Sequence, residues 1–259
     1  INVILYNWLL FTLYQKNKMR LSIITVVKND KKNLEHTIKS VLAQNYKDFE
    51  YIIFDGLSSD RIESVINKYK KKNIKYIRRS DKNYYDGLNQ AISKAKGDYI
   101  GILNAGDLYR DKNVLKIVME KLLMTKCDLL FSNLKYYKLN KKNVRLWKFP
   151  IQKLSKFSAL KIASPTLFVK NKIFESNPYD IKYDISSDTD FNLSISSKKY
   201  TFVYLNKYIV SMKKGGLSTR YSLLLRKMLQ DLLILKKHFG FLFFGVYIYK
   251  IFLKIKQFR

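Results

Sequence analysis

The sequence predicts an α/β fold in which helices flank a mainly parallel sheet and a basic helical appendage follows. Up to residue 107, short β-branched runs alternate with stretches of helical periodicity. Strands that alternate with helices indicate a parallel sheet covered on both faces. Polar clusters follow the second and fourth runs, at the edge where such sheets bind ligands. From residue 221 onward, long apolar runs are broken by pairs of Lys and Arg.

The first eighteen residues are left out of this fold prediction. Residues 1–14 are mostly apolar and aromatic, and Lys16 and Lys18 follow them. A signal peptide has its charges before the apolar run and a small-residue cleavage site after it, and neither is present. The run is also shorter than the ~20 residues that span a bilayer. We therefore treat 1–18 as an N-terminal extension and Met19 as a candidate start.

Strands and helices are expected at regular intervals through the first half. Residues 21–27 have the length and composition of a buried strand. Apolar residues at helical spacing predict a helix over 30–42, with Asp30 as its N-cap. The same patterns predict strands at 49–54, 74–77 and 99–103 and helices at 60–71 and 84–94.

The second half is less regular. It is expected to hold a helix at 114–124, a strand at 128–132 and a hairpin over 134–149. Residues 134–173 contain eleven Lys or Arg and no acidic residue, whereas 180–190 contain four Asp. Without an internal repeat or a low-complexity linker, we expect one α/β domain over 19–220 and amphipathic basic helices over 221–259.

The composition excludes several classes of protein. The 259 residues include 50 Lys and Arg against 20 Asp and Glu, a net charge of +30, and 47% are hydrophobic, which excludes a disordered chain. The single Cys127 excludes a disulfide framework, and two histidines disfavour a zinc centre. The positive charge indicates nucleic acid, an anionic membrane, phosphate-bearing substrates, or only biased codon usage.

Two polar clusters lie at the expected carboxyl ends of strands. Residues 55–60 present Asp55 with Gly and Ser, which suits a ribose or base edge, or else a simple turn with Asp60 capping a helix. Asn104 and Asp107 follow the strand at 99–103. Since Mg²⁺ is usually held by one or two carboxylates plus substrate phosphates, Asp107 is a candidate metal ligand, with helix capping as the alternative.

A third cluster places Asp188 and Asp190 two residues apart, before an apolar segment. Such carboxylates supply a general base or cap a helix.

The order of these clusters resembles that of the family 2 glycosyltransferases, inverting enzymes of the GT-A fold that use nucleotide-diphosphate sugars. The resemblance rests on LSIITVVKND at 21–30, TIKSVLAQ at 37–44, FEYIIFDGLSSD at 49–60, YDGLNQAI at 85–92, AKGDYI at 95–100 and LNAGD at 103–107. It continues less specifically with SDTDF at 187–191 and GGLS at 215–218. Bacterial enzymes that build polysaccharide and lipopolysaccharide are similar.

The resemblance implies roles for eight residues. Asp107 corresponds to the second carboxylate of the family's Asp-x-Asp motif and would hold a divalent metal, Mn or Mg. Asp188, with Asp190 as the alternative, corresponds to the base that takes a proton from the acceptor hydroxyl. The metal and basic groups then stabilise the leaving diphosphate, in one direct displacement. The nucleotide-binding positions implied are Thr25, Asn29, Asp55, Ser58, Asp86 and Asn104.

Four departures from the family pattern accompany these matches. Asn104 replaces the first Asp of the metal motif, so metal binding is weaker or rests on Asp107 alone. Lys28 replaces a Tyr, and Arg61-Ile62 replace a Gly-Thr pair. Around Ser164-Pro165-Thr166 a His-Gln pair is absent, which affects the acceptor side. A non-catalytic relative therefore remains an alternative.

The tail at 221–259 resembles an interfacial anchor more than a membrane span, because Lys and Arg interrupt its apolar runs before ~20 residues accumulate. Packing on the catalytic domain or on a second copy is the alternative. We therefore expect a cytoplasmic enzyme, peripheral at the inner face of the cell membrane, that moves a sugar from a UDP-sugar to a lipid-linked or cell-surface glycan.

The competing hypothesis is a basic protein that binds polyanions or nucleic acid. No nucleic-acid motif is visible, and that hypothesis leaves the acidic clusters at the strand ends unexplained. We therefore expect no nucleic-acid partner.

Overall fold

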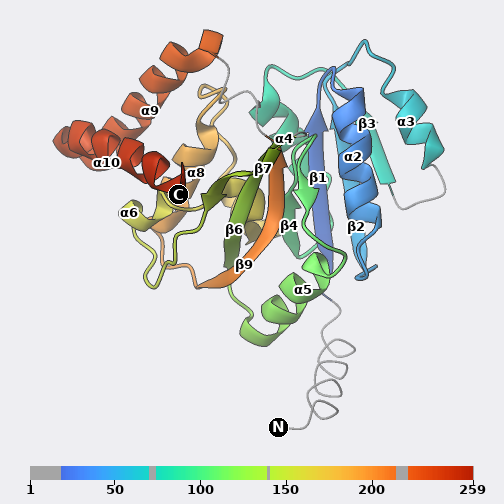
Figure 1. The fold of residues 1–259 in the computed structure, drawn as a ribbon, viewed down its shortest axis with the longest axis horizontal. Helices are drawn as coiled ribbons and strands as arrows, with labels where there is room; N and C mark the ends of the chain where they lie inside the picture. The colour runs from blue at the N-terminus through green and yellow to red at the C-terminus, as the bar shows by residue number, and fades with distance from the viewer. Residues whose placement is uncertain (1–18, 70–73, 139–140, 214–220, 259) are drawn as a thin grey trace.

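A computed structural model of the chain describes residues 19–69, 74–138, 141–213 and 221–258 (Figure 1). The expected extension 1–18 and the Gly-Gly segment at 215–218 lie outside these residues. The described strands form one sheet in the order β3-β2-β1-β4-β8-β6-β9-β5, and β7 pairs with β6. The α/β fold, its mainly parallel sheet and its C-terminal helices are as predicted.

The strands are β1 (Leu21–Val27), β2 (Phe49–Asp55), β3 (Ile74–Arg78), β4 (Tyr99–Ile102), β5 (Leu108–Tyr109), β6 (Leu129–Lys138), β7 (Lys141–Trp147), β8 (Phe168–Lys170) and β9 (Phe202–Lys213). The α-helices are α2 (Lys31–Leu42), α3 (Glu63–Lys68), α4 (Tyr84–Ile92), α5 (Val114–Thr125), α6 (Lys156–Ala159), α7 (Asn171–Ser176), α8 (Ser187–Ser196), α9 (Leu224–Phe239) and α10 (Phe243–Ile255). Short 3₁₀ turns include η1 (Ser164–Thr166), η4 (Gly240–Leu242) and η5 (Lys256–Phe258).

The first half of the sheet is parallel, as the alternation of strands and helices predicts. β1 lies between β2 and β4, and β3 continues the sheet beyond β2. Val27 pairs with Asp55, so the loops after β1 and β2 leave the sheet at the same edge. This edge collects the polar clusters that follow the strands.

The second half is mixed, which the sequence patterns did not show. β8 is antiparallel to both β4 and β6, and β6 is parallel to β9. β8 and β5 have three and two residues, too few for a detectable period. The expected hairpin at 134–149 is formed by β6 and β7, but β6 also includes most of the strand expected at 128–132.

The N-terminus of α2 differs from the prediction. Asp30 occupies the N-cap position, but its side chain makes no capping hydrogen bond and instead accepts one from Asn33 Nδ2 at 2.6 Å. Asp60 takes the capping role from outside the helix, because its Oδ2 accepts the Lys31 N–H at 2.8 Å. Asp60 does not cap α3, which begins only at Glu63. The loop after β2 therefore fixes the start of α2.

The C-terminal helices form a hairpin at one end of the molecule, beyond α8 and far from α2 and α3 (Figure 1). The stretch Leu224–Ile255 is long and apolar enough, by length and composition alone, to cross a membrane. It is nevertheless not one straight helix. Gly240 has φ +57 and ends α9, and α10 then packs against α9. The two helices have 16 and 13 residues, each short of the ~20 that a span needs.

Candidate active site

The loops after β1 and β2 are tied together by Asn29, which has a left-handed φ of 53°. Its backbone N–H donates to Ser58 Oγ at 2.8 Å, and its side-chain oxygen accepts the Ser59 N–H at 2.7 Å. Ser58 is buried, whereas Asn29 is exposed. These two predicted nucleotide-binding residues thus form one hydrogen-bonded rim at the sheet edge.

Asp55 lies beneath this rim and is fully buried. Its Oδ1 accepts the Ser58 N–H at 2.8 Å, its Oδ2 accepts the Tyr76 hydroxyl at 2.6 Å, and Arg78 Nε lies 3.5 Å from Oδ2. Burial, with the Asp55 carboxylate adding to it, raises the pKa of Tyr76 well above the usual tyrosine range. Both carboxylate oxygens therefore shape the loop, and a direct contact of Asp55 with a nucleotide stays a prediction.

Asp81 is a carboxylate at this rim that the sequence reasoning did not single out. A Cβ on Gly56 would lie 2.1 Å from Asp81 Oδ2, so the carboxylate rests directly on the glycine. Burial raises the pKa of Asp81 even though Lys28 Nζ is 3.9 Å away. The sequence signal that could have pointed to such a contact is Gly56, because a glycine without a Cβ lets another side chain approach the backbone closely.

Asp81 and Asp86 line a common open hollow of about 360 Å³, together with Arg79, Ser80, Lys82 and Gln90. Asp86 Oδ2 accepts the Lys82 N–H at 2.8 Å and Gln90 Nε2 at 3.2 Å. Asp86, a predicted nucleotide-binding carboxylate, thus borders a hollow, whereas Asp55 is fully buried.

Thr25 is buried inside the sheet rather than exposed at its edge. Its hydroxyl donates to the Leu103 carbonyl at 2.7 Å and lies 3.0 Å from the Tyr51 hydroxyl. It therefore fixes the end of β4, from which Asn104 and Asp107 follow.

Asp107 is 3% exposed, and protein groups donate to both of its carboxylate oxygens. The Lys213 N–H donates to Oδ1 at 2.9 Å, and Asn104 Nδ2 donates to Oδ2 at 3.2 Å. Burial raises the pKa of Asp107 to about 7, although both hydrogen bonds lower it. A cation beside this carboxyl would favour its charged form, so the site is chemically receptive to one.

The oxygen atoms around Asp107 are of the kind that binds a hard cation, but they are few. Among the residues that the structure describes, no group of three or more His, Cys, Asp or Glu side chains converges. Asp107 and the neighbouring Asn104 amide offer oxygen atoms only, which matches the preference of Mg²⁺ and Mn²⁺. A cation here would need further ligands from a substrate diphosphate.

Tyr84 connects this turn with the third cluster. Its hydroxyl donates to Asn104 Oδ1. Burial raises the pKa of Tyr84 far above its usual value, and the charges of Asp107 and Asp188 both add to the rise. The structure therefore brings Asp107 and Asp188 to the same side chain from positions 81 residues apart.

Asp188 and Asp190, both in the first turn of α8, have different surroundings. Asp188 is partly exposed, and its Oδ2 accepts Ser164 Oγ at 3.3 Å. Asp190 is buried, and its Oδ1 lies 2.9 Å from Lys237 Nζ and 2.8 Å from His238 Nε2. Burial alone would raise the pKa of Asp190, but hydrogen bonds from His238 and Lys237 outweigh it and hold the pKa below its usual value.

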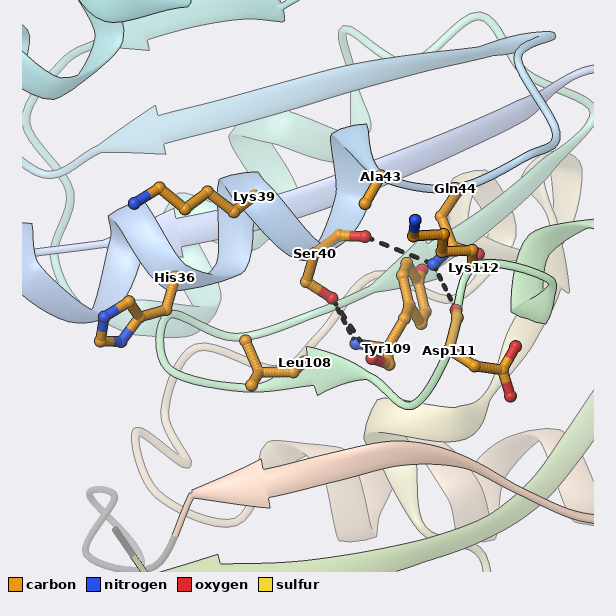
Figure 2. Close-up of a pocket in the computed structure, with 9 residues that line it drawn as sticks. All are labelled: His36, Lys39, Ser40, Ala43, Gln44, Leu108, Tyr109, Asp111 and Lys112. Carbon is orange, nitrogen blue, oxygen red and sulfur yellow. Dashed lines mark hydrogen bonds between the residues drawn. The ribbon is translucent and has the colours of Figure 1, made fainter.

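A second hollow, of about 350 Å³, lies between α2 and β5, with His36 and Lys39 at one end (Figure 2). Its floor is closed by hydrogen bonds from the Tyr109 N–H to Ser40 Oγ at 2.7 Å and from Gln44 Nε2 to the Asp111 carbonyl at 2.7 Å. None of the eight predicted site residues belongs to its described lining, so we do not assign it to the site.

A comparison with known proteins decides the family. The sequence profile described as "Glycosyl transferase family 2" matches residues 22–180. The chain belongs to glycosyl transferase family 2. The match includes the seven predicted nucleotide and metal residues, and Asp188 follows eight residues after its end.

Relatives of this glycosyltransferase occur in archaea and bacteria. An uncharacterized glycosyltransferase of Methanocaldococcus jannaschii is 26% identical over 234 residues, which cover 86% of this chain and 81% of the relative. The glucosyltransferase WfaP of Escherichia coli, whose named acceptor is α-D-GlcNAc-diphosphoundecaprenol, is 38% identical over 92 residues. That match covers 34% of this chain and 36% of WfaP.

Solved structures agree with the fold. S. aureus TarS superposes with a TM-score of 0.69 at 16% identity, over 90% of this chain and 72% of the other. The mannosyltransferase PcManGT of Pyrobaculum calidifontis, solved with GDP-Man and Mn²⁺, gives 0.65 at 13% identity, over 90% and 70% of the two chains. The predicted GT-A fold of this glycosyltransferase is therefore confirmed.

Proposed function

We propose that this enzyme is an inverting glycosyltransferase that transfers a sugar from a UDP-sugar to a lipid-linked glycan by direct displacement. The observation that carries the proposal is that Tyr84 hydrogen-bonds to Asn104 beside Asp107, and that the charges of Asp107 and Asp188 both raise the pKa of Tyr84 in addition to its burial. A displacement needs a charge-stabilising group at the leaving diphosphate and a base at the attacking hydroxyl. The two carboxylates have positions that suit these two tasks.

Asp188 fits the base better than Asp190 does. The Asp188 carboxylate accepts hydrogen bonds from Ser164 Oγ and from the Thr189 N–H, and it remains partly exposed. Asp190 is buried, with Lys237 on both of its carboxylate oxygens and His238 on Oδ1. In this mechanism Asp188 accepts the proton of the acceptor hydroxyl while the new glycosidic bond forms and the bond to the nucleoside diphosphate breaks.

A divalent cation fits beside Asp107, with the Asn104 amide next to it and substrate phosphates as the remaining ligands. Such a cation supplies charge stabilisation for the leaving diphosphate. The structure of a neighbour with GDP-Man and Mn²⁺ and those of TarS with UDP and UDP-GlcNAc support this assignment by likeness of fold. UDP-sugars are favoured because the named donor of WfaP is UDP-Glc.

The C-terminal hairpin supports a place at the membrane surface. Three of its charged residues, Lys227, Asp231 and Lys250, are largely buried, and Lys237, which is 45% exposed, pairs with Asp190 of α8. Its outer side exposes large apolar residues: Leu224, Leu225, Met228, Leu229, Leu233, Phe241, Leu242, Phe244, Ile248, Ile251, Phe252 and Ile255. So large an apolar face marks an interaction surface. We assign it to an anionic bilayer, since basic residues such as Arg226, Lys236 and Lys256 are exposed on the same hairpin.

The donor and the metal are tested together by thermal shift with UDP-, GDP- and dTDP-sugars, each with and without Mn²⁺ or Mg²⁺. We expect UDP-sugars to raise the melting temperature, and more so with metal. Asp188→Asn should keep that shift and lose sugar transfer by about 10²–10⁴-fold. A fully active Asp188→Asn variant would show that the assignment of the base is wrong.

Membrane contact is tested by co-sedimentation with phosphatidylglycerol vesicles. The double variant Leu229→Ser and Leu233→Ser should stay in the supernatant, whereas the wild type should sediment. Wild-type protein that remains a soluble dimer in the presence of the vesicles would assign the face to a second copy instead.

A further inference from the structure

Three lysine side chains, Lys227, Lys250 and Lys254, come together where α9 packs against α10. Lys227 and Lys250 share the Asp231 carboxylate, and Lys254 follows Lys250 by one turn on α10. The charges of Lys227 and Lys250 both lower the pKa of Lys254, in addition to its burial. We call these three lysines the basic cluster.

Among the residues that the structure describes, Asp231 is the carboxylate paired with the three lysines of the basic cluster. Its Oδ1 lies 3.3 Å from Lys227 Nζ and 3.0 Å from Lys250 Nζ. Burial, followed by repulsion from Lys227 and Lys250, lowers the pKa of Lys254 to about 8. Lys227 and Lys250 are only 13% and 11% exposed. Burying several positive charges around one carboxylate costs stability, which an anionic ligand would offset.

The basic cluster reaches the residues on both sides of the proposed base. Lys227 Nζ donates to Ser186 Oγ at 3.0 Å, and Lys250 Nζ donates to Thr189 Oγ1 at 3.1 Å. The charge of Asp188 also acts on Lys250. An anion held by the cluster would therefore lie next to the place where the acceptor hydroxyl meets Asp188.

We propose that the basic cluster binds the diphosphate of a lipid-linked acceptor. Two negative phosphate groups match the surplus of cations, and the neighbouring outer face of the hairpin offers apolar surface for the lipid chain. The donor diphosphate belongs to another place, at Asp107, whose carboxylate is bound by the Lys213 N–H and Asn104 Nδ2. This inference rests on the proposed function, because it requires that the acceptor be lipid-linked.

Binding of geranyl diphosphate to the full chain tests the site, measured by calorimetry with saturating UDP and Mn²⁺ so that the donor site is filled. Lys254→Gln removes a charge and breaks none of the described hydrogen bonds. It should weaken binding by at least about tenfold, whereas Lys254→Arg should retain it. Lys256→Gln is the matched control, because Lys256 lies two residues after Lys254 but is exposed, with its Nζ 4.7 Å from the centroid of the Phe252 ring, and should leave geranyl diphosphate binding unchanged.

Three results would overturn the proposal. Lys254→Gln could bind geranyl diphosphate as tightly as the wild type does, the wild type could fail to bind it in saturating UDP, or geraniol could bind equally well. Phosphatidylglycerol vesicles test whether the ligand is a phospholipid headgroup instead. If Lys254→Gln weakens binding to these vesicles as much as it weakens binding of geranyl diphosphate, the cluster is a lipid-headgroup site. Unaltered melting temperatures of the variants establish that they fold.

Failure of the proposed function has a separate signature. If the wild type transfers no sugar from any nucleotide donor but still binds geranyl diphosphate through Lys254, the catalytic assignment is wrong and the site remains. If transfer occurs but Lys254→Gln leaves both binding and the acceptor KM unchanged, this inference alone is wrong.

Discussion

The Tyr84 hydroxyl donates a hydrogen bond to the Asn104 side-chain oxygen, and this orients the Asn104 amide to donate in turn to Asp107. A short relay thus runs from the first residue of α4 to the candidate metal ligand. Asn104 is the residue that departs from the family's Asp-x-Asp pattern. The relay gives this amide a defined orientation, which a carboxylate in its place would not need.

Removing the hydroxyl in Tyr84→Phe should free Asn104 to rotate. One lost hydrogen bond is worth about 1 kcal/mol, so we expect the Mn²⁺ concentration for half-maximal activity to rise about fivefold. Tyr99→Phe is the control, because it loses a buried hydrogen bond to the Cys127 carbonyl far from the site. An equal change of metal requirement in both variants would contradict the relay.

Gly56→Ala should displace the Asp81 carboxylate, because the new Cβ would lie 2.1 Å from Asp81 Oδ2. The clash is with the end of a side chain, so we expect a small loss of stability. UDP binding, measured by calorimetry, should weaken about tenfold if Asp81 borders the nucleotide. Gly245→Ala on α10 meets nothing within 4 Å and should leave UDP binding unchanged. Equal UDP affinity in both variants would remove Asp81 from the site.

Asp231 should contribute to the acid sensitivity of the fold. Burial alone would raise its pKa, but Lys250 and Lys227 outweigh burial and lower the pKa from 3.8 to about 2. A folded pKa below the unfolded value gives stability that is complete above pH 4 and lost as the pH falls toward 2. Urea unfolding of the wild type should show this decline.

In Asp231→Asn, the loss of stability between pH 4 and pH 2 that comes from Asp231 should be absent. The variant should also be less stable at pH 7 by about 3–5 kcal/mol, since it leaves Lys227 and Lys250 buried without their carboxylate. Identical acid slopes in the two proteins would mean that Asp231 is not the group responsible.

The basic cluster should bind diphosphate more weakly as the pH rises past about 8. The pKa of Lys254 is lowered to about 8 by burial and by Lys227, Lys250 and Arg145, while Asp231 opposes the shift. Only the protonated amine attracts an anion, so geranyl diphosphate affinity should be full below this pH and fall above it. Lys254→Arg should remove the dependence, because arginine stays charged. A pH-independent affinity in the wild type would assign the binding to other residues.

The first half of the fold follows from the sequence because its determinants are local. β1, β2 and α4 have clear periodicity, and the polar ends of parallel strands necessarily meet at one edge. The register of β1 with β2 then places Asn29 beside Ser58.

What the sequence did not reveal depends on contacts between distant segments. Asp60 caps α2 across 29 residues, and Lys237 and His238 engage Asp190 across 47 and 48. No periodicity encodes such pairs. Asp190 and Asp188 look equivalent in the chain, and only the packing of α9 on α8 distinguishes them.

The apolar outer side of the C-terminal hairpin has a practical consequence. Lys237 pairs with Asp190 of α8 and Lys250 donates to Thr189 of the same helix, whereas the outer side exposes apolar side chains, with Phe241 at 91% exposure. In a buffer without lipid or detergent, this apolar side is removed from water by contact with a second molecule of the same enzyme. Purified protein should therefore cluster as its concentration rises and disperse when a mild detergent is added.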